Sequence, residues 1–253
     1  MQPETLIRAS QGVLEGLFSV ANDKRVRFSR GNLQYNPARN EWRFANRQFD
    51  IIGINNMKNS EHYAGWIDLF AWGTSGYRYR PPYFFAMLNT AYGRGKRNIE
   101  GTHYDWGLHN PISNGGNEAG LWRTMTVNEW AYLLMRRPDA YYLSYPASIN
   151  DHKGLVLLPD NWLTDGGDTI NPNESHLYTI SQWRLLERAG AVFLPCAGYQ
   201  KISFYHYGYP IDGDPLGGMI GILSGEPAQI ENGIRYLAEN HVTTEVLKDG
   251  SAD

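Results

Sequence analysis

Cysteine is nearly absent from this chain. Cys196 is the only cysteine among the 253 residues, so the sequence can form neither an internal disulfide nor a cysteine-based zinc cluster. A single cysteine therefore does not indicate whether the protein works in an oxidising or a reducing compartment.

Clusters of charge and long apolar runs are also missing. The formal net charge is −3, and the longest basic stretch, Arg-Gly-Lys-Arg at 94–97, lies in a glycine-rich turn. Binding to nucleic acid or to an anionic membrane surface needs a denser basic patch. No window approaches the ~20 apolar residues of a membrane span, and residues 1–4 lack the features of a signal peptide. We therefore expect no nucleic acid partner, no membrane insertion and no export signal in these residues.

The spacings typical of metal and nucleophile sites are absent too. The seven histidines include no pair four residues apart, and no Gly-x-Ser-x-Gly motif occurs. His103 and His109 could share a metal, but loop histidines have the same appearance. The stretch from Asp165 and Asp168 to Glu174 offers oxygen ligands of the kind that calcium prefers, yet its Asp-Gly-Gly-Asp and Asn-Pro sequences are also common in turns. We predict ordinary loops here, with no metal and no cofactor.

Aromatic residues, in contrast, are abundant. The chain has 8 Trp and 17 Tyr, more than packing usually recruits. Such side chains give a large contact area and keep a polar tip, which suits recognition surfaces, although a core of short strands also uses them. We assign the tryptophans to the core and the clustered tyrosines to recognition.

The region from residue 14 to 209 favours an α+β fold. Short aromatic or β-branched runs alternate with Gly, Asn and Pro, a pattern typical of short strands and long loops. One helix is expected to start at Thr126, with Glu129 completing a capping box and Pro138 ending it. A second is expected to start near Thr179 or Ser181 and to end at Gly190, with Trp183 facing inward.

The composition changes after residue 209. All tryptophans and all tyrosines except Tyr236 precede residue 210. The rest predicts an apolar strand at 219–223, a helix at 228–240 and a second strand at 242–247. We therefore divide the chain into an N-terminal extension (1–13), a main domain (14–209) and a βαβ segment (210–253).

Several sequence strings resemble a family of Bacteroidetes surface proteins over about residues 12–200. They include GLFSV at 16–20, VRFSRGNLQY at 26–35, GWIDLFAWGTSG at 65–76, LWRTMTVNEW at 121–130 and GAVFLPCAGY at 190–199. The string at 121–130 resembles the helix-opening motif of the formylglycine-generating-enzyme-like branch of the C-type lectin fold. The variable proteins of diversity-generating retroelements share that fold. The resemblance implies a C-type-lectin-like domain with many short strands, long loops and two helices, at the cell surface or secreted.

The resemblance does not imply an enzyme, because function depends on the site and not on the fold. The oxidase of that branch works through paired cysteines, whereas this chain has Cys196 alone. We predict a buried small-residue role for Cys196 and no catalytic activity. Two alternatives remain open: a formylglycine-generating-type enzyme, in which Cys196 acts alone or with a metal, and a structural or pilus-tip domain.

The segment 199–209, YQKISFYHYGY, indicates a binding loop. Five of its eleven residues are Tyr or Phe, and it lacks the alternation of a half-buried strand. Tyr, Ser and His after a rigid strand are typical of paratopes, and diversified residues lie in this region of the resembling retroelement proteins. An aromatic stack against the following segment would show the same composition. We predict a protein or glycan ligand held by Tyr199, Ser203, Phe204, Tyr205, His206, Tyr207 and Tyr209.

The last residues show a second resemblance. Residues 215–225, 230–237 and 242–247 are similar to the last third of the regulatory (NIL) domain of methionine-importing ABC transporter ATPases. That domain has a βαββαβ plan and senses the amino acid. One βαβ unit is too short to bury its own apolar face, so we expect a fused, vestigial sensing segment that docks loosely on the main domain.

Overall fold

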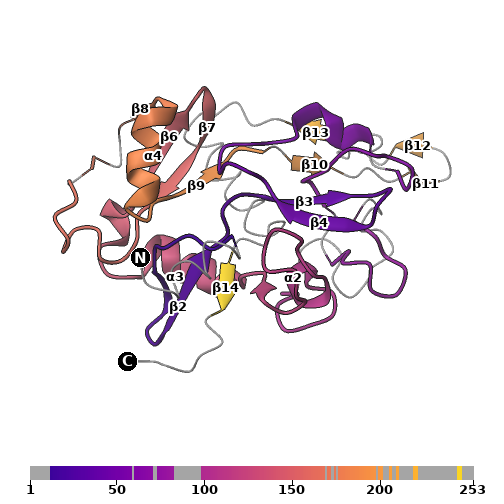
Figure 1. Ribbon diagram of the computed structural model, residues 1–253, viewed down its shortest axis with the longest axis horizontal. Coiled ribbons are helices and arrows are strands. Elements are labelled where there is room, and N and C mark those ends of the chain that lie inside the picture. Colours follow the sequence, from indigo (N-terminus) through magenta and orange to yellow (C-terminus); the bar gives the residue numbers. More distant parts are fainter. Residues whose placement is uncertain are drawn as a thin grey trace.

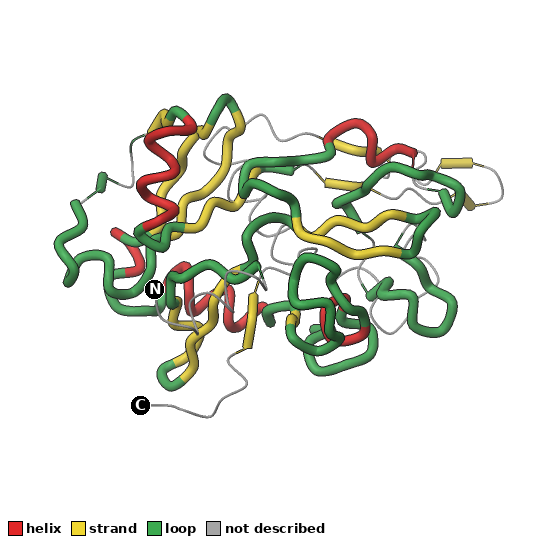
Figure 2. The backbone as a smooth tube through the Cα atoms, viewed as in Figure 1, coloured by secondary structure: helices red, strands yellow, loops and turns green. Residues whose placement is uncertain are grey.

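The computed structural model describes residues 12–58, 60–70, 73–82, 98–168, 170–171, 174 and 176–197, together with the backbone of five short strands between 199 and 246. These residues form a mixed α+β structure with few helices and several small sheets (Figures 1 and 2). The predicted α+β class is therefore confirmed.

One four-stranded sheet contains the first strands of the chain. Its order is β1 (Phe18–Ala21), β2 (Lys24–Phe28), β14 (Thr244–Val246) and β5 (Trp122–Arg123), and all neighbours are antiparallel. In β1, Phe18 and Val20 are buried and alternate with half-buried residues, the pattern of a strand with one face on the core. Helix α3 (Val127–Met135) packs on β1, so that Trp130 contacts Phe28 with ring centroids 6.0 Å apart.

A second four-stranded sheet lies above the first in the view of Figure 1, with α4 (Ile180–Arg188) against it. Its order is β8 (His176–Tyr178), β6 (Ser144–Ile149), β7 (His152–Leu157) and β9 (Val192–Pro195). Strands β6 and β7 form a hairpin whose two turn residues, Asn150 and Asp151, have φ values of 49° and 66°. Two consecutive positive φ values define the turn type that matches the twist of a hairpin, and Asn and Asp tolerate them best.

Smaller elements complete the described structure. Strands β3 (Leu33–Asn36) and β4 (Glu41–Phe44) pair as a hairpin. The short helices are η1 (Gly53–Lys58), α2 (Trp106–His109) and η4 (Ala140–Tyr142). Strand β10 (Tyr199–Lys201) pairs with β13 (Met219–Gly221), and β11 (Tyr205–His206) pairs with β12 (Tyr209–Pro210).

The two predicted helices are confirmed, with their caps. Thr126 and Glu129 form the expected capping box at α3, whose last residue is Met135, with Arg136 as the C-cap two residues before Pro138. In α4, Thr179 is the N-cap and forms a second capping box with Gln182. Helix formation here follows local chemistry, because each box satisfies backbone N–H groups that the first turn leaves unpaired.

The buried tryptophans lie in three apolar clusters, as their assignment to the core predicts. One cluster joins the first sheet and α3 to strands β7 and β9 of the second sheet, one surrounds the β3–β4 hairpin and α2, and one lies between the second sheet and α4. The tryptophans with at most a tenth of their surface exposed are Trp42, Trp106, Trp122, Trp130, Trp162 and Trp183.

A single carboxylate links distant parts of the core. Asp160 accepts hydrogen bonds from the backbone N–H and the hydroxyl of Ser19, at 3.1 and 2.7 Å, and from the guanidinium of Arg137 at 3.1 Å. The Arg137 side chain is fully buried and also lies 5.7 Å from the Phe18 ring centroid. Asp160 thus supplies the counter-charge for a buried cation and fixes β1 beside it.

The two predicted C-terminal strands occupy different sheets. β13 pairs with β10, and β14 pairs with both β2 and β5; Figure 1 shows β14 beside β2. The strands are therefore not neighbours of each other, as strands of one isolated βαβ unit would be. The predicted helix at 228–240 lies outside the described residues, and the division of the chain at residue 210 stays a prediction.

Candidate functional site

The predicted binding segment folds back on itself at its C-terminal end. Tyr199 lies in β10, and Tyr205 opposes Pro210 while His206 opposes Tyr209 in the β11–β12 pair. The backbone here forms short antiparallel ladders and not one continuous loop. In Figure 1, β11 and β12 lie at the edge of the molecule. The side chains of the seven predicted residues, and the whole of Ser203, Phe204 and Tyr207, lie outside the described residues.

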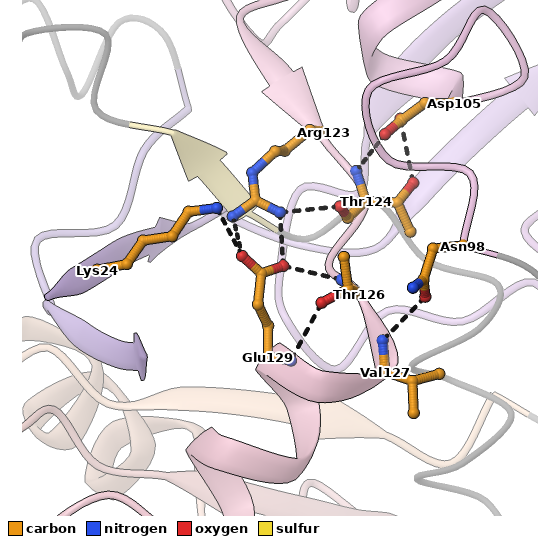
Figure 3. Close-up of polar contacts among 8 residues, drawn as sticks. All are labelled: Lys24, Asn98, Asp105, Arg123, Thr124, Thr126, Val127 and Glu129. Atoms are coloured by element: carbon orange, nitrogen blue, oxygen red, sulfur yellow. Dashed lines mark hydrogen bonds and ion pairs between the residues drawn. The ribbon is translucent and has the colours of Figure 1, made fainter. Parts of the chain in front are cut away.

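The best-defined polar cluster lies at the string 121–130, where the side chains of Arg123 and Glu129 form a bidentate ion pair (Figure 3). The two N···O distances are 2.7 and 2.8 Å, and the two side chains are 7% and 9% exposed. Lys24 adds a third charge, with its Nζ 2.8 Å from Glu129 Oε1. The pair therefore ties β5 and β2 to the first turn of α3.

The charge state of Glu129 follows from this setting. Burial alone would raise the pKa of its carboxyl, but hydrogen bonds from Arg123 and Lys24 and from the Thr126 backbone N–H outweigh burial and lower the pKa. Glu129 is therefore ionised at neutral pH. Both of its oxygens accept bonds from the protein, so the arrangement anchors a helix and leaves no oxygen poised for catalysis.

A second buried carboxylate, Asp105, lies beside this pair (Figure 3). Asp105 caps α2 by accepting from the Gly107 N–H at 3.1 Å, and it also accepts from the N–H and the hydroxyl of Thr124 at 2.9 and 3.1 Å. A parallel link runs from the Val127 N–H to Asn98 Oδ1, at 3.1 Å. These bonds fasten the loop before α2 to the strand that leads into α3.

Asp105 should make stability depend on pH. Burial raises the pKa of this carboxyl to about 6, although hydrogen bonds from Thr124 and Gly107 oppose the rise. Because the folded pKa exceeds the unfolded value of about 3.9, the stabilisation from Asp105 is present below that value and is lost as pH rises through about 6. Between pH 4 and 7 the wild type should lose about 2 kcal/mol more unfolding free energy than Asp105→Asn. Urea unfolding at both pH values measures this, and parallel pH profiles for the two proteins would contradict it.

Cys196 is buried, in agreement with the sequence prediction. Burial raises the pKa of its thiol to about 11. At neutral pH the reactive thiolate is then on the order of one molecule in ten thousand. The environment of Cys196 is that of an inert core residue.

The candidate calcium stretch has the contacts of a turn. Trp162 Nε1 donates to the Asp168 carbonyl at 3.1 Å, and Asn171 Nδ2 donates to Glu174 Oε1 at 2.7 Å. Within the described ranges, no group of three or more His, Cys, Asp or Glu side chains has the arrangement of a metal site.

No family model, curated protein or solved structure matches the chain. The likeness to C-type-lectin-like and NIL domains therefore rests on the sequence strings given above.

Among the helices of the described residues, none is long and apolar enough to cross a membrane.

The two histidines that were weighed as a metal pair belong to an aromatic cluster that we did not predict. His103 and His109 lie together, with ring centroids 5.8 Å apart, and the ring of Tyr77 stacks on His103 at 4.9 Å. Tyr104 completes the group, 5.2 Å from Tyr77. Burial and the neighbouring His103 lower the pKa of His109. In the sequence, the cluster could have been suspected from the alternation Tyr-Arg-Tyr-Arg at 77–80, which lies between a glycine and two prolines.

Proposed function

We propose that this chain is a non-catalytic recognition module with a C-type-lectin-like fold, which binds a protein or glycan through residues 199–209. The observation that carries the proposal is the β11–β12 pair, which brings His206 and Tyr209 into register at the edge of the molecule (Figure 1). A short hairpin at an edge can present aromatic residues on a fixed backbone, which lowers the entropy lost on binding.

The chemistry of the described buried acids supports binding over catalysis. Asp68 accepts from Asn56 Nδ2 at 2.7 Å and from the Ile52 N–H at 3.0 Å, and burial raises its pKa to about 6. Like Asp105 and Glu129, it stabilises a local backbone arrangement. A general acid or base would instead need an accessible substrate within hydrogen-bond reach.

A recognition module of this kind fits a position at the cell surface or outside the cell, which the family resemblance also implies. Its partner is then a protein or glycan met there, and neither nucleic acid nor the membrane interior. The low charge density of the sequence supports that choice, because a binder of nucleic acid depends on a basic surface.

Glycan and protein arrays test the proposal. The wild type should bind a defined ligand, and Tyr205→Ala and Tyr207→Ala should each weaken binding about 10- to 100-fold, as loss of a central aromatic anchor does. Tyr141→Ala is the matched control, because Tyr141 lies in η4 and is 57% exposed. Unchanged binding in both loop variants would contradict the proposal, and a folded wild type without any ligand would favour a structural or pilus-tip domain.

Incubation with a cysteine-containing sulfatase peptide tests the enzyme alternative. Mass spectrometry should detect no formylglycine. Turnover by the wild type that is lost in Cys196→Ala would replace the binding proposal with a formylglycine-generating activity.

A further inference from the structure

One strand from the C-terminal part of the chain fills a gap in the first sheet. Strand β14 pairs antiparallel with β2 on one side and with β5 on the other. Because neighbouring strands of a sheet lie about 4.8 Å apart, β2 and β5 are separated by roughly twice that distance, which admits one strand and prevents direct pairing. Without β14, both strands would turn unpaired backbone N–H and C=O groups toward the gap. We call the gap between β2 and β5 the strand slot.

The walls of the strand slot are held by contacts that do not involve β14. Lys24 of β2 and Arg123 of β5 both bind the carboxylate of Glu129 in α3, at N···O distances of 2.8 and 2.7 Å (Figure 3). Beside them, the Thr124 N–H donates to Asp105 at 2.9 Å and fixes the end of β5 to the loop before α2. Strand β2 is also paired with β1 along its other edge. The walls can therefore stay in place while the strand between them is exchanged.

The strand slot holds β14 in a defined register. Val246 lies opposite Val26, and Glu245, the only charged residue of β14, lies opposite Arg27. Val26 is fully buried, and Arg27 is only 8% exposed. Opposite charges at facing positions favour one alignment, and a slip of one residue would place Glu245 opposite Val26 or Phe28. The sequence that fits the strand slot is therefore that of β14 itself.

A long connection separates β14 from the strand before it. Strand β13 ends at Gly221 in a different sheet, and the 22 residues from 222 to 243 lie between it and β14. A connection of this length spans about 75 Å when it is extended. The radius of gyration expected for a folded chain of 253 residues is only about 18 Å. The connection is thus long enough for β14 to reach the strand slot of a second molecule.

We propose that the strand slot is a self-association site, at which two copies of this chain exchange β14. Each copy places its residues 244–246 between β2 and β5 of the other copy, in the register of the monomer. The same backbone ladders form in both states, so the exchange changes only the connection and the entropy of association. The occupant follows from the structure, because the strand that lies in the slot is present in every copy.

The exchange goes beyond the proposed function and does not depend on it. A dimer formed in this way carries two copies of residues 199–209, and such a bivalent module can bind a multivalent surface more tightly than either copy alone. The self-association is tested without any ligand, so its failure would leave the proposed recognition function unaffected.

Disulfide trapping between two differently substituted full-length chains tests the inference. One chain carries Val26→Cys and the other Val246→Cys, both with Cys196→Ala, so that a disulfide between β2 and β14 can form only between copies. Facing residues of antiparallel strands have Cα atoms about 4.5–5.5 Å apart, within the range of a disulfide. A mixture at about 1 mM, near the effective concentration of a tethered strand, should give a cross-linked dimer after mild oxidation. Tyr141→Cys in place of Val26→Cys is the control, because Tyr141 is 57% exposed in η4, and it should give little dimer.

A proline in β14 separates strand exchange from random contact. Glu245→Pro removes a backbone donor from the middle of the strand, so adding it to the Val246→Cys chain should abolish the cross-link. Glu245→Gln keeps that donor and should reduce the cross-link at most about 5-fold. A synthetic peptide of residues 242–247 should bind the chain with Glu245→Pro alone and raise its Tm, whereas a scrambled peptide should not.

Several outcomes would overturn the inference. One is a disulfide that forms within a chain carrying both cysteines but never between the mixed chains. Equal trapping with Tyr141→Cys would be another, and so would a cross-link that persists with Glu245→Pro. A folded Glu245→Pro chain whose Tm does not respond to the peptide would show that the strand slot accepts no strand from outside. If Glu245→Pro does not fold, the comparison of Val26→Cys with Tyr141→Cys decides the question.

Discussion

Glu129→Ala should lower the free energy of unfolding by about 3–5 kcal/mol, because the change removes the carboxylate that forms a bidentate pair with a buried guanidinium. Arg123 is 7% exposed and makes both of its short carboxylate bonds to Glu129. The same change removes one half of the capping box of α3. Urea unfolding followed by tryptophan fluorescence measures the loss.

A surface pair provides the control for this experiment. Arg39 and Glu41 also form an ion pair, at 2.9 Å, but their side chains are 55% and 38% exposed. Glu41→Ala should therefore cost no more than about 1 kcal/mol. Similar small losses in the two variants would show that the Arg123–Glu129 pair does not hold the helix in place.

Acid should weaken the same interaction. Since the folded pKa of Glu129 is lowered, its stabilisation is present above the unfolded pKa and is lost as pH falls through the folded value. The gap between wild type and Glu129→Ala should narrow in acid accordingly. This direction is opposite to the one expected for Asp105.

Trp122→Ala should destabilise the protein by about 3–5 kcal/mol, through the cavity that remains when a large buried ring is removed. Trp122 is 1% exposed, its ring lies 4.7 Å from that of Phe44, and its Nε1 donates to the Gly115 carbonyl at 2.7 Å. For a chain of this length, the loss corresponds to a fall in Tm of about 6–20 °C. Thermal unfolding followed by circular dichroism measures it.

Trp66→Ala is the comparison for this change. Trp66 is half-buried and stacks on the guanidinium of Arg43, whose carbon lies 3.7 Å from the ring centroid. Its removal exposes little apolar surface and leaves little cavity, so the loss should be smaller. A Trp122 variant that is no less stable than the Trp66 variant would contradict the assigned core position.

Local signals in the sequence predicted the helices well. The spacing from Thr126 to Glu129 identifies a capping box by itself, because both partners lie within one turn. The order of strands in the sheets could not be predicted from local signals. β2 and β5 flank β14, and β6 runs parallel to β8, although nothing near these strands in sequence specifies their partners.

For the candidate sites too, local composition was informative, whereas contacts between distant residues could not be predicted. Composition identified the aromatic segment at 199–209, but not the short ladders that its backbone forms. The packing of Tyr77 on His103 and His109 was missed, because the two histidines follow 26 and 32 residues later and meet Tyr77 only in the fold. Two histidines that resembled ordinary loop residues in the sequence thus form an aromatic cluster with Tyr77.

The contacts of Asp160 also affect how the chain acquires its structure. Ser19 and Asp160 are separated by 141 positions, and a ribosome adding about 5–20 residues per second takes roughly 7–28 s to synthesise that interval. During this time β1 and β2 can already pair as a hairpin. Arg137 is synthesised before Asp160, so its guanidinium has to remain without this carboxylate until Asp160 is added. Contacts between such distant residues slow folding, because a large loop must close before they form. Strands β1 and β2 of a nascent chain should therefore remain accessible to chaperones at least until Asp160 has been synthesised.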